Sequence, residues 1–166
     1  MNIPREANRV QECCRSSVRK MRLGLLIGFG LAVAAQVGAV DRSFFIGHWL
    51  NVDDQTRGIK AIEIGSQDNQ IFMLAWGAFT PNPCRWGQAR VSTLASSVSS
   101  SDVSAATAVY KPGFKVTRLT MRPGPGHTLI VEVLNHFNDN SGRSDYADTE
   151  TFRLARSDEW DFNTYR

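Results

Sequence analysis

The chain has 166 residues, of which 42% are hydrophobic and 21% are charged, and this length allows one domain. Its formal charge of +3 belongs to the N-terminal region, because residues 40–166 hold 13 basic and 14 acidic side chains. A domain with a net charge of −1 offers no net electrostatic argument for binding nucleic acid or an anionic membrane.

The first 39 residues have the order of a secretory signal peptide. Basic residues come first, a short apolar run follows, and small residues end it at 37–39. We therefore predict a secreted or periplasmic protein whose mature chain begins at Val40 and does not insert into a membrane. A transmembrane anchor is the alternative, but the run is short and interrupted by glycines. Residues 1–20 are unusually polar for a leader, so Met21 is an alternative start.

The cysteines follow the same division. Cys13 and Cys14 fall in the predicted leader, and Cys84 remains alone in the domain. One cysteine cannot form a disulfide within the domain, although an exported compartment permits disulfides. Because the sequence places no histidine near Cys84, a buried or incidental thiol is favoured over a reactive one.

From Val40 onward, short segments rich in β-branched and aromatic residues alternate with turn clusters, which is typical of an all-β fold. No segment shows a helical period of apolar residues. A serine-rich stretch over 95–104 is expected to be a loop or a poorly packed edge, and a β-bulge is expected near Thr117-Arg118. The expected strands cover residues 44–52, 59–65, 70–77, 87–94, 105–110, 114–122, 128–137 and 146–155.

Eight consecutive antiparallel strands have few stable arrangements. A meander that closes on itself leaves no exposed edge, and this favours an eight-stranded up-and-down barrel. A two-sheet β-sandwich is the alternative.

The opening stretch carries a Gly-x-Trp step at Gly47-His48-Trp49. In an extended strand, Phe45, Gly47, Trp49 and Asn51 share one face, so the indole is expected to plug one end of the barrel. The step resembles the opening strand of lipocalins. That resemblance implies that a basic residue of the last strand, Arg153, lies across the indole.

Further motifs accompany the opening one: Trp76-Gly77 and Trp86-Gly87 flank a proline-rich connection, and His136-Phe137 opens a polar loop. With Phe45-x-Gly47-x-Trp49-x-Asn51 they resemble a family of small secreted bacterial domains of uncharacterised function, over nearly all of residues 44–155. The family has a cysteine where this chain has Phe79. A loop disulfide or metal site of the family type therefore lacks a residue here.

The candidate binding residues are aromatic. Trp76, Phe79 and Trp86 are expected at one barrel mouth, with inward side chains such as Phe72, Leu74 and Val131 lining or filling the interior. The alternative is that Trp76 and Trp86 pack on each other and on the proline, and so close that end of the barrel.

Catalytic and metal signatures are missing from the sequence. His48, His127 and His136 lack metal-ligand spacing, and no pattern pairs Glu63, Glu132 and Glu150 as acid and base. The Asp139–Asp145 stretch lacks a full calcium-loop spacing, so a polar hairpin is expected there. We predict no cofactor, no metal and no enzymatic activity.

Two functions remain open. The first is an exported module that binds a small apolar or amphipathic ligand at an aromatic mouth. The second is a solid barrel without a cavity that acts as a protein-interaction or cell-envelope module. Barrel size does not decide between them, because an eight-stranded interior either fills with side chains or holds one small ligand.

Overall fold

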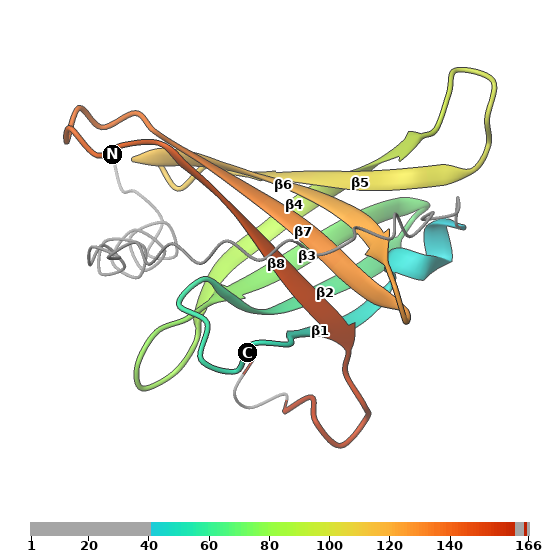
Figure 1. Cartoon of the computed structure of the whole chain (residues 1–166), viewed down its shortest axis with the longest axis horizontal. Coiled ribbons are helices and arrows are strands. Elements are labelled where there is room, and N and C mark those ends of the chain that lie inside the picture. The colour runs from blue at the N-terminus through green and yellow to red at the C-terminus, as the bar shows by residue number, and fades with distance from the viewer. Residues whose placement is uncertain (1–40, 162–164, 166) are drawn as a thin grey trace, which may run out of the picture.

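The computed structural model describes residues 41–161 and 165, so the predicted leader and both alternative starts lie outside the described residues. A short 3-10 helix precedes eight antiparallel strands (Figure 1). These elements are η1 (Arg42–Phe45), β1 (Gly47–Asn51), β2 (Ile59–Gln67), β3 (Gln70–Gly77), β4 (Cys84–Ala95), β5 (Val103–Tyr110), β6 (Lys115–Gly124), β7 (Thr128–Phe137) and β8 (Tyr146–Leu154).

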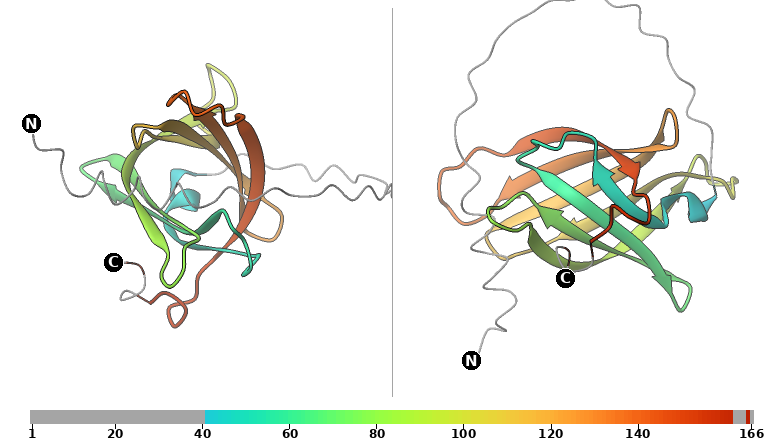
Figure 2. Two further views of the ribbon diagram at one scale, coloured as in Figure 1. Left: turned by 90° about the vertical axis from the view of Figure 1, so that its left-hand side faces the viewer. Right: turned by 90° about the horizontal axis from the view of Figure 1, so that it is seen from below.

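Each strand pairs with the next one in the chain, and β8 pairs with β1, so the sheet closes into an up-and-down barrel. The end-on view in Figure 2 shows the closed ring of strands. The predicted barrel is therefore confirmed, and the sandwich alternative is wrong.

Most expected strands occur within a few residues of their predicted bounds, with two local differences. Phe44 and Phe45 lie in η1 rather than in the first strand. The bulge expected near Thr117-Arg118 is not formed, because β6 alternates regularly and directs Lys115 and Thr117 inward. Irregularities in pairing occur instead at Ile59/Ala61, Leu74/Trp76 and Leu94/Ala95.

The closed end of the barrel is organised by Trp49. Its side chain is 0% exposed, and its Nε1 donates a hydrogen bond to the carbonyl of Phe45 at 3.0 Å. Phe44 lies 5.8 Å from the indole between ring centroids, and His127 of the β6–β7 turn stacks on it at 6.0 Å. The indole therefore fills this end, and η1 holds its one polar atom.

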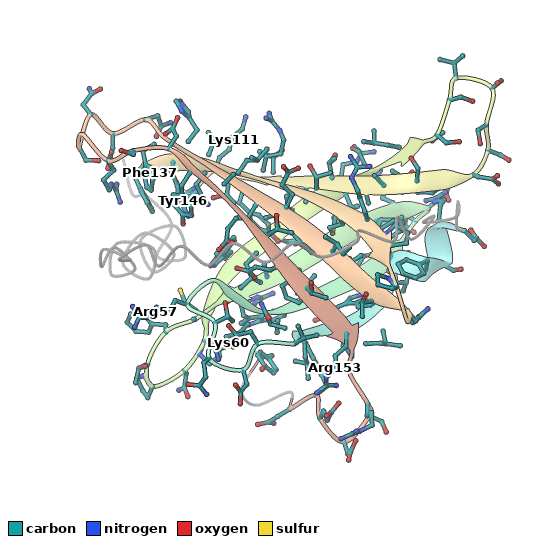
Figure 3. The ribbon with its side chains drawn as sticks, viewed as in Figure 1. Arg57, Lys60, Lys111, Phe137, Tyr146 and Arg153 are labelled. Carbon is teal, nitrogen blue, oxygen red and sulfur yellow. The ribbon has the colours of Figure 1, made fainter. Side chains whose placement is uncertain are left out.

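Arg153 does not lie across this indole. Trp49 is paired with Leu154, while Arg153 is paired with Leu50, one position along the seam, where side chains face outward. Its guanidinium binds the carboxylate of Glu159 at 2.6 and 2.9 Å, on the outside of the barrel (Figure 3). The expected contact is wrong because strand alternation places Trp49 and Arg153 on opposite faces.

The C-terminal segment, residues 155–161 with Tyr165, adds a second layer outside the barrel. Trp160 and Tyr165 stack at 4.6 Å and pack with Trp76 against Ala61 on the outer face of β2 and β3. His48 of β1 stacks on Trp160 at 4.2 Å. The outer face of β1 to β3 is therefore covered where Leu50, Ala61 and Trp76 lie.

Replacing Trp49 by alanine should lower the free energy of unfolding by about 3–5 kcal/mol, since it leaves a cavity at the closed end. Trp49→Phe should cost less because it keeps most of the ring volume. Arg153→Ala, which removes a surface ion pair, should hardly move the urea midpoint. A larger loss for Arg153→Ala than for Trp49→Ala would contradict this assignment of the plug.

Candidate functional site

The candidate site lies at the open end of the barrel, opposite Trp49. Four loops surround it, over residues 52–58, 78–83, 111–114 and 138–145. Figure 3 shows Arg57 on the first of these loops, and Phe137 and Tyr146 on the β7–β8 hairpin, at the same end of the molecule. Arg153 lies at the other end.

The cavity inside this end has a volume of about 70 Å³. We call it the open-end cavity. Ionisable and amide side chains share its wall with three aromatic rings. It is lined by Arg57, Gly58, Ile59, Gly77, Ala78, Cys84, Trp86, Lys115, Val133, Asn135, Phe137, Tyr146, Asp148 and Glu150.

Glu150 is the most constrained acidic group in this lining. It points inward from β8, two residues before buried Phe152, and is 8% exposed. Both carboxylate oxygens accept the backbone N–H of Ile59 at 3.1 Å, and Oε2 also accepts Asn51 Nδ2 at 3.0 Å. The carboxylate thus joins β8 to the end of β1 and the start of β2.

Gly58 leaves the room that Glu150 occupies. A Cβ at this position would lie 1.7 Å from Oε1 of Glu150, which no packing tolerates. The residue before β2 must therefore lack a side chain for the carboxylate to reach the Ile59 amide.

The other side of the cavity is held by a buried polar group on β6 and β7. Asn135 Oδ1 accepts hydrogen bonds from Lys115 Nζ at 2.8 Å and from Thr117 Oγ1 at 2.7 Å. The Lys115 ammonium also lies over the Trp86 ring, 5.3 Å from its centroid. Trp86 in turn meets Tyr110 edge-on at 5.6 Å. These contacts fix the cationic side of the cavity within the barrel.

Burial raises the pKa of Glu150 to about 7. The negative charges of Asp148 and Asp53 add to this rise, while the hydrogen bonds from Ile59 and Asn51 oppose it. Burial also raises the pKa of Tyr110, whose hydroxyl donates to the carbonyl of Met73 at 3.0 Å. A carboxyl that titrates near neutral pH inside a cavity is a common property of functional sites.

The structure does not bring the four predicted aromatic residues together. Trp86 lines the open-end cavity, and Phe79 is 42% exposed on the neighbouring β3–β4 loop. Trp76 points outward and lies under the C-terminal segment, and Phe72 lies on the outer face beside a groove of about 190 Å³. The predicted placement is therefore wrong for Trp76 and Phe72, and the binding role of Trp86 and Phe79 stays a prediction.

The predicted inward face of β3 is wrong. Met73 and Ala75 point into the core, while Phe72 and Leu74 face outward; Val131 on β7 does point inward. Both faces of β3 are apolar because the C-terminal segment covers the outer one. Alternation in the sequence therefore could not distinguish them.

Cys84 is buried and disulfide-bonded, and the residue that it pairs with lies outside the described residues. Neither form of a free thiol expected from the sequence therefore applies. His127 packs on Phe44, and His136 binds Asp145 at 2.6 Å. Within residues 41–161 and 165, no three ligand-type side chains cluster as a metal site would require.

Sequence reasoning missed Glu150, Lys115 and Asn135 as a group. One signal was available: alternation from buried Phe152 places Glu150 and Asp148 on the inward face of β8. For β6, the same signal was hidden because apolar Phe114 and Val116 suggested the opposite phase.

Replacing Gly58 by alanine should destabilise the fold, because the new methyl group must displace the Glu150 carboxylate from Ile59 and Asn51. Gly65→Ala is a matched control, since a Cβ there meets no atom within 4 Å. Thermal unfolding of both variants tests this. Equal melting temperatures would show that Glu150 is not held against residue 58.

The stability of the protein should depend on pH through Glu150. Its folded-state pKa of about 7 lies above the ordinary value of 4.5, so the folded protein keeps a proton that the unfolded chain loses between these values. The contribution is complete below about pH 4.5 and is lost as pH rises toward 7, by on the order of 3 kcal/mol. Glu150→Gln should flatten this dependence in urea unfolding measured from pH 5 to 8. Parallel pH profiles for wild type and variant would contradict it.

Comparisons with known proteins add no family to this description. No family model matches the chain, and neither the curated proteins nor the solved structures contain a match. None of the described residues form a helix with the length and hydropathy that a membrane span requires.

Proposed function

We propose that this protein is an exported, non-enzymatic recognition module whose open end receives one small cationic group, such as a lysine or arginine side chain of a protein partner. The observation that carries the proposal is Glu150, a buried carboxylate in the wall of a small cavity. The charged groups that shift its pKa are Asp148 and Asp53, both acidic. A cation is the chemical complement of these carboxylates, and it competes for them with Lys115 and Arg57, which share the lining.

The size of the cavity supports a single side-chain group rather than a whole ligand. About 70 Å³ holds a few waters or one terminal group, whereas pockets for small molecules commonly measure 300–1,000 Å³. The remaining interior is filled by apolar side chains, including Ile62, Met73, Leu119, Val131 and Phe152. This favours a solid barrel that acts through its surface over a carrier of a small apolar ligand.

The chemistry of the lining supports binding rather than catalysis. The described lining includes no serine, threonine or histidine, and its one hydroxyl is the phenol of Tyr146, so Glu150 has no aliphatic hydroxyl or imidazole beside it to activate. Its oxygens are instead occupied by a backbone amide and a carboxamide, which fix its position.

Titration with N-acetyl-arginine amide, which carries one positive charge, tests the proposal. Nuclear magnetic resonance should show shifts of the Ile59 amide and the Trp86 indole, and a lower pKa for Glu150. Glu150→Gln should remove the response. Arg57→Gln should strengthen it, because Arg57 places a like charge in the same lining.

Two control ligands set the limits. N-acetylglycine, which carries one negative charge, and dodecanoate, which is apolar and long, should cause no shifts at these positions. Binding of N-acetylglycine alone would assign the cavity to anions through Lys115, and binding of dodecanoate would restore the apolar-carrier function. Either result would overturn the proposal.

A further inference from the structure

Charge is segregated around the barrel. Strands β4, β5 and β6 contain no aspartate or glutamate, although the described chain as a whole holds both signs. Of the four exposed arginines on these strands, Arg85 lies at the start of β4, and the other three point outward farther along the strands: Arg90, Arg118 and Arg122. We call their shared outer surface the basic wall. None of the three forms an ion pair with another described residue.

The strand register places these arginines in rows with apolar side chains. Val109 of β5 is paired with Arg118 of β6. Val91 is paired with Ala108, so Arg90 faces Val109 from the other side, one step along β4. Val109 is 38% exposed and therefore lies between two cations on the surface.

The β4–β5 hairpin continues this pattern beyond the wall. Leu94 is 45% exposed near the end of β4, and Val98 is fully exposed in the loop that follows. Figure 1 shows this loop extending past the closed end, on the same side of the barrel as β5. The loop otherwise consists mainly of serines, so Val98 is an isolated apolar tip on a polar projection.

We propose that the basic wall docks on an anionic phospholipid bilayer, with the β4–β5 loop placing Val98 among the lipid headgroups. Arginines near such a surface are attracted to lipid phosphates, and exposed aliphatic side chains gain by entering the boundary between headgroups and acyl chains. The basic wall supplies the charge, and Leu94, Val98 and Val109 supply the apolar contact. The docking is peripheral and crosses no part of the bilayer.

A lipid surface fits the basic wall better than a nucleic acid does. Proteins that bind single strands combine basic residues with exposed aromatic rings on which bases stack. On β4 to β6 the aromatic residues, Trp86 and Tyr110, belong to the interior, and the exposed apolar side chains are aliphatic. The outward ring paired with the wall, Phe72 opposite Arg90, is half-buried on β3.

The net charge of residues 40–166 gives no sign of the basic wall. The 13 basic and 14 acidic residues of 40–166 nearly cancel, but the acidic ones nearest the basic wall are confined to its borders. Asp102 lies in the β4–β5 loop, and Glu132 lies on β7 opposite Thr120. At 0.1 M salt, charges beyond about 10 Å are screened, so the wall acts by its local sign.

Vesicle sedimentation with the full chain tests this inference. Partitioning to vesicles of phosphatidylcholine with about 30% phosphatidylglycerol is compared with partitioning to pure phosphatidylcholine vesicles, at low and at high salt. The variant R90Q/R118Q/R122Q should lose at least about tenfold in partitioning to the anionic vesicles. The control R42Q/K60Q/R156Q removes the same charge elsewhere and should lose about twofold or less.

A second pair of measurements separates the apolar contact from charge and from folding. Val98→Ser should weaken vesicle binding several-fold without changing the melting temperature, because Val98 packs on nothing. A duplex DNA of equal phosphate concentration should compete poorly. Equal losses for the two triple variants, no preference for anionic vesicles, no effect of Val98→Ser, or DNA binding as tight as vesicle binding would each overturn the proposal.

Discussion

The barrel closes along its shortest seam, where β1 and β8 are paired through Trp49–Leu154, Leu50–Arg153 and Asn51–Phe152. Every other pair of neighbouring strands has a longer register or a hairpin turn to hold it, but this seam joins the two ends of the sheet. Backbone hydrogen bonds extend it at both ends, from Val52 N–H to Thr151 O at 2.9 Å and from Ala155 N–H to His48 O at 2.7 Å. The closed ring depends on keeping these few contacts together.

Different interactions stabilise the two ends of this seam. At one end, Trp49 contributes buried area and places its polar atom on a nearby carbonyl. At the other end, Glu150 reaches across from β8 to Asn51 and Ile59. The apolar end is therefore filled, and the end closed through hydrogen bonds retains a small polar space. The candidate site therefore results from the way in which hydrogen bonds, rather than apolar packing, join β8 to β1 and β2 at the open end.

Much of the fold could be predicted because turn residues and short β-rich segments divide the chain clearly. The phase of individual strands was harder to predict. On β3, Phe72 and Leu74 are as apolar as Met73 and Ala75, and the cover on the outer face comes from distant residues such as Trp160 that carry no strand pattern. On β6, the inward positions include Lys115 and Thr117, which reverse the usual rule that polar residues face out.

The same limits explain what was missed at the site. Trp86 was recognised by its aromatic motif, but the polar residues around it have no motif and come from β6, β7 and β8. Their proximity is a product of the closed ring, since β8 is brought beside β1 only by closure. The sequence shows that Glu150 and Phe152 share one face of β8. It does not show that Gly58 lies against the Glu150 carboxylate.

The C-terminal layer gives the barrel two unequal halves. Strands β1 to β3 are packed by the core inside and, over part of their outer face, by Trp160 and Tyr165, whereas the outer surface of β4 to β6 meets solvent. Local opening must therefore expose more apolar area in the first half than in the second. Amide hydrogens of β2 and β3 are therefore expected to exchange slowest. The barrel then consists of a rigid half, β1 to β3, and a half that opens more easily, β4 to β6.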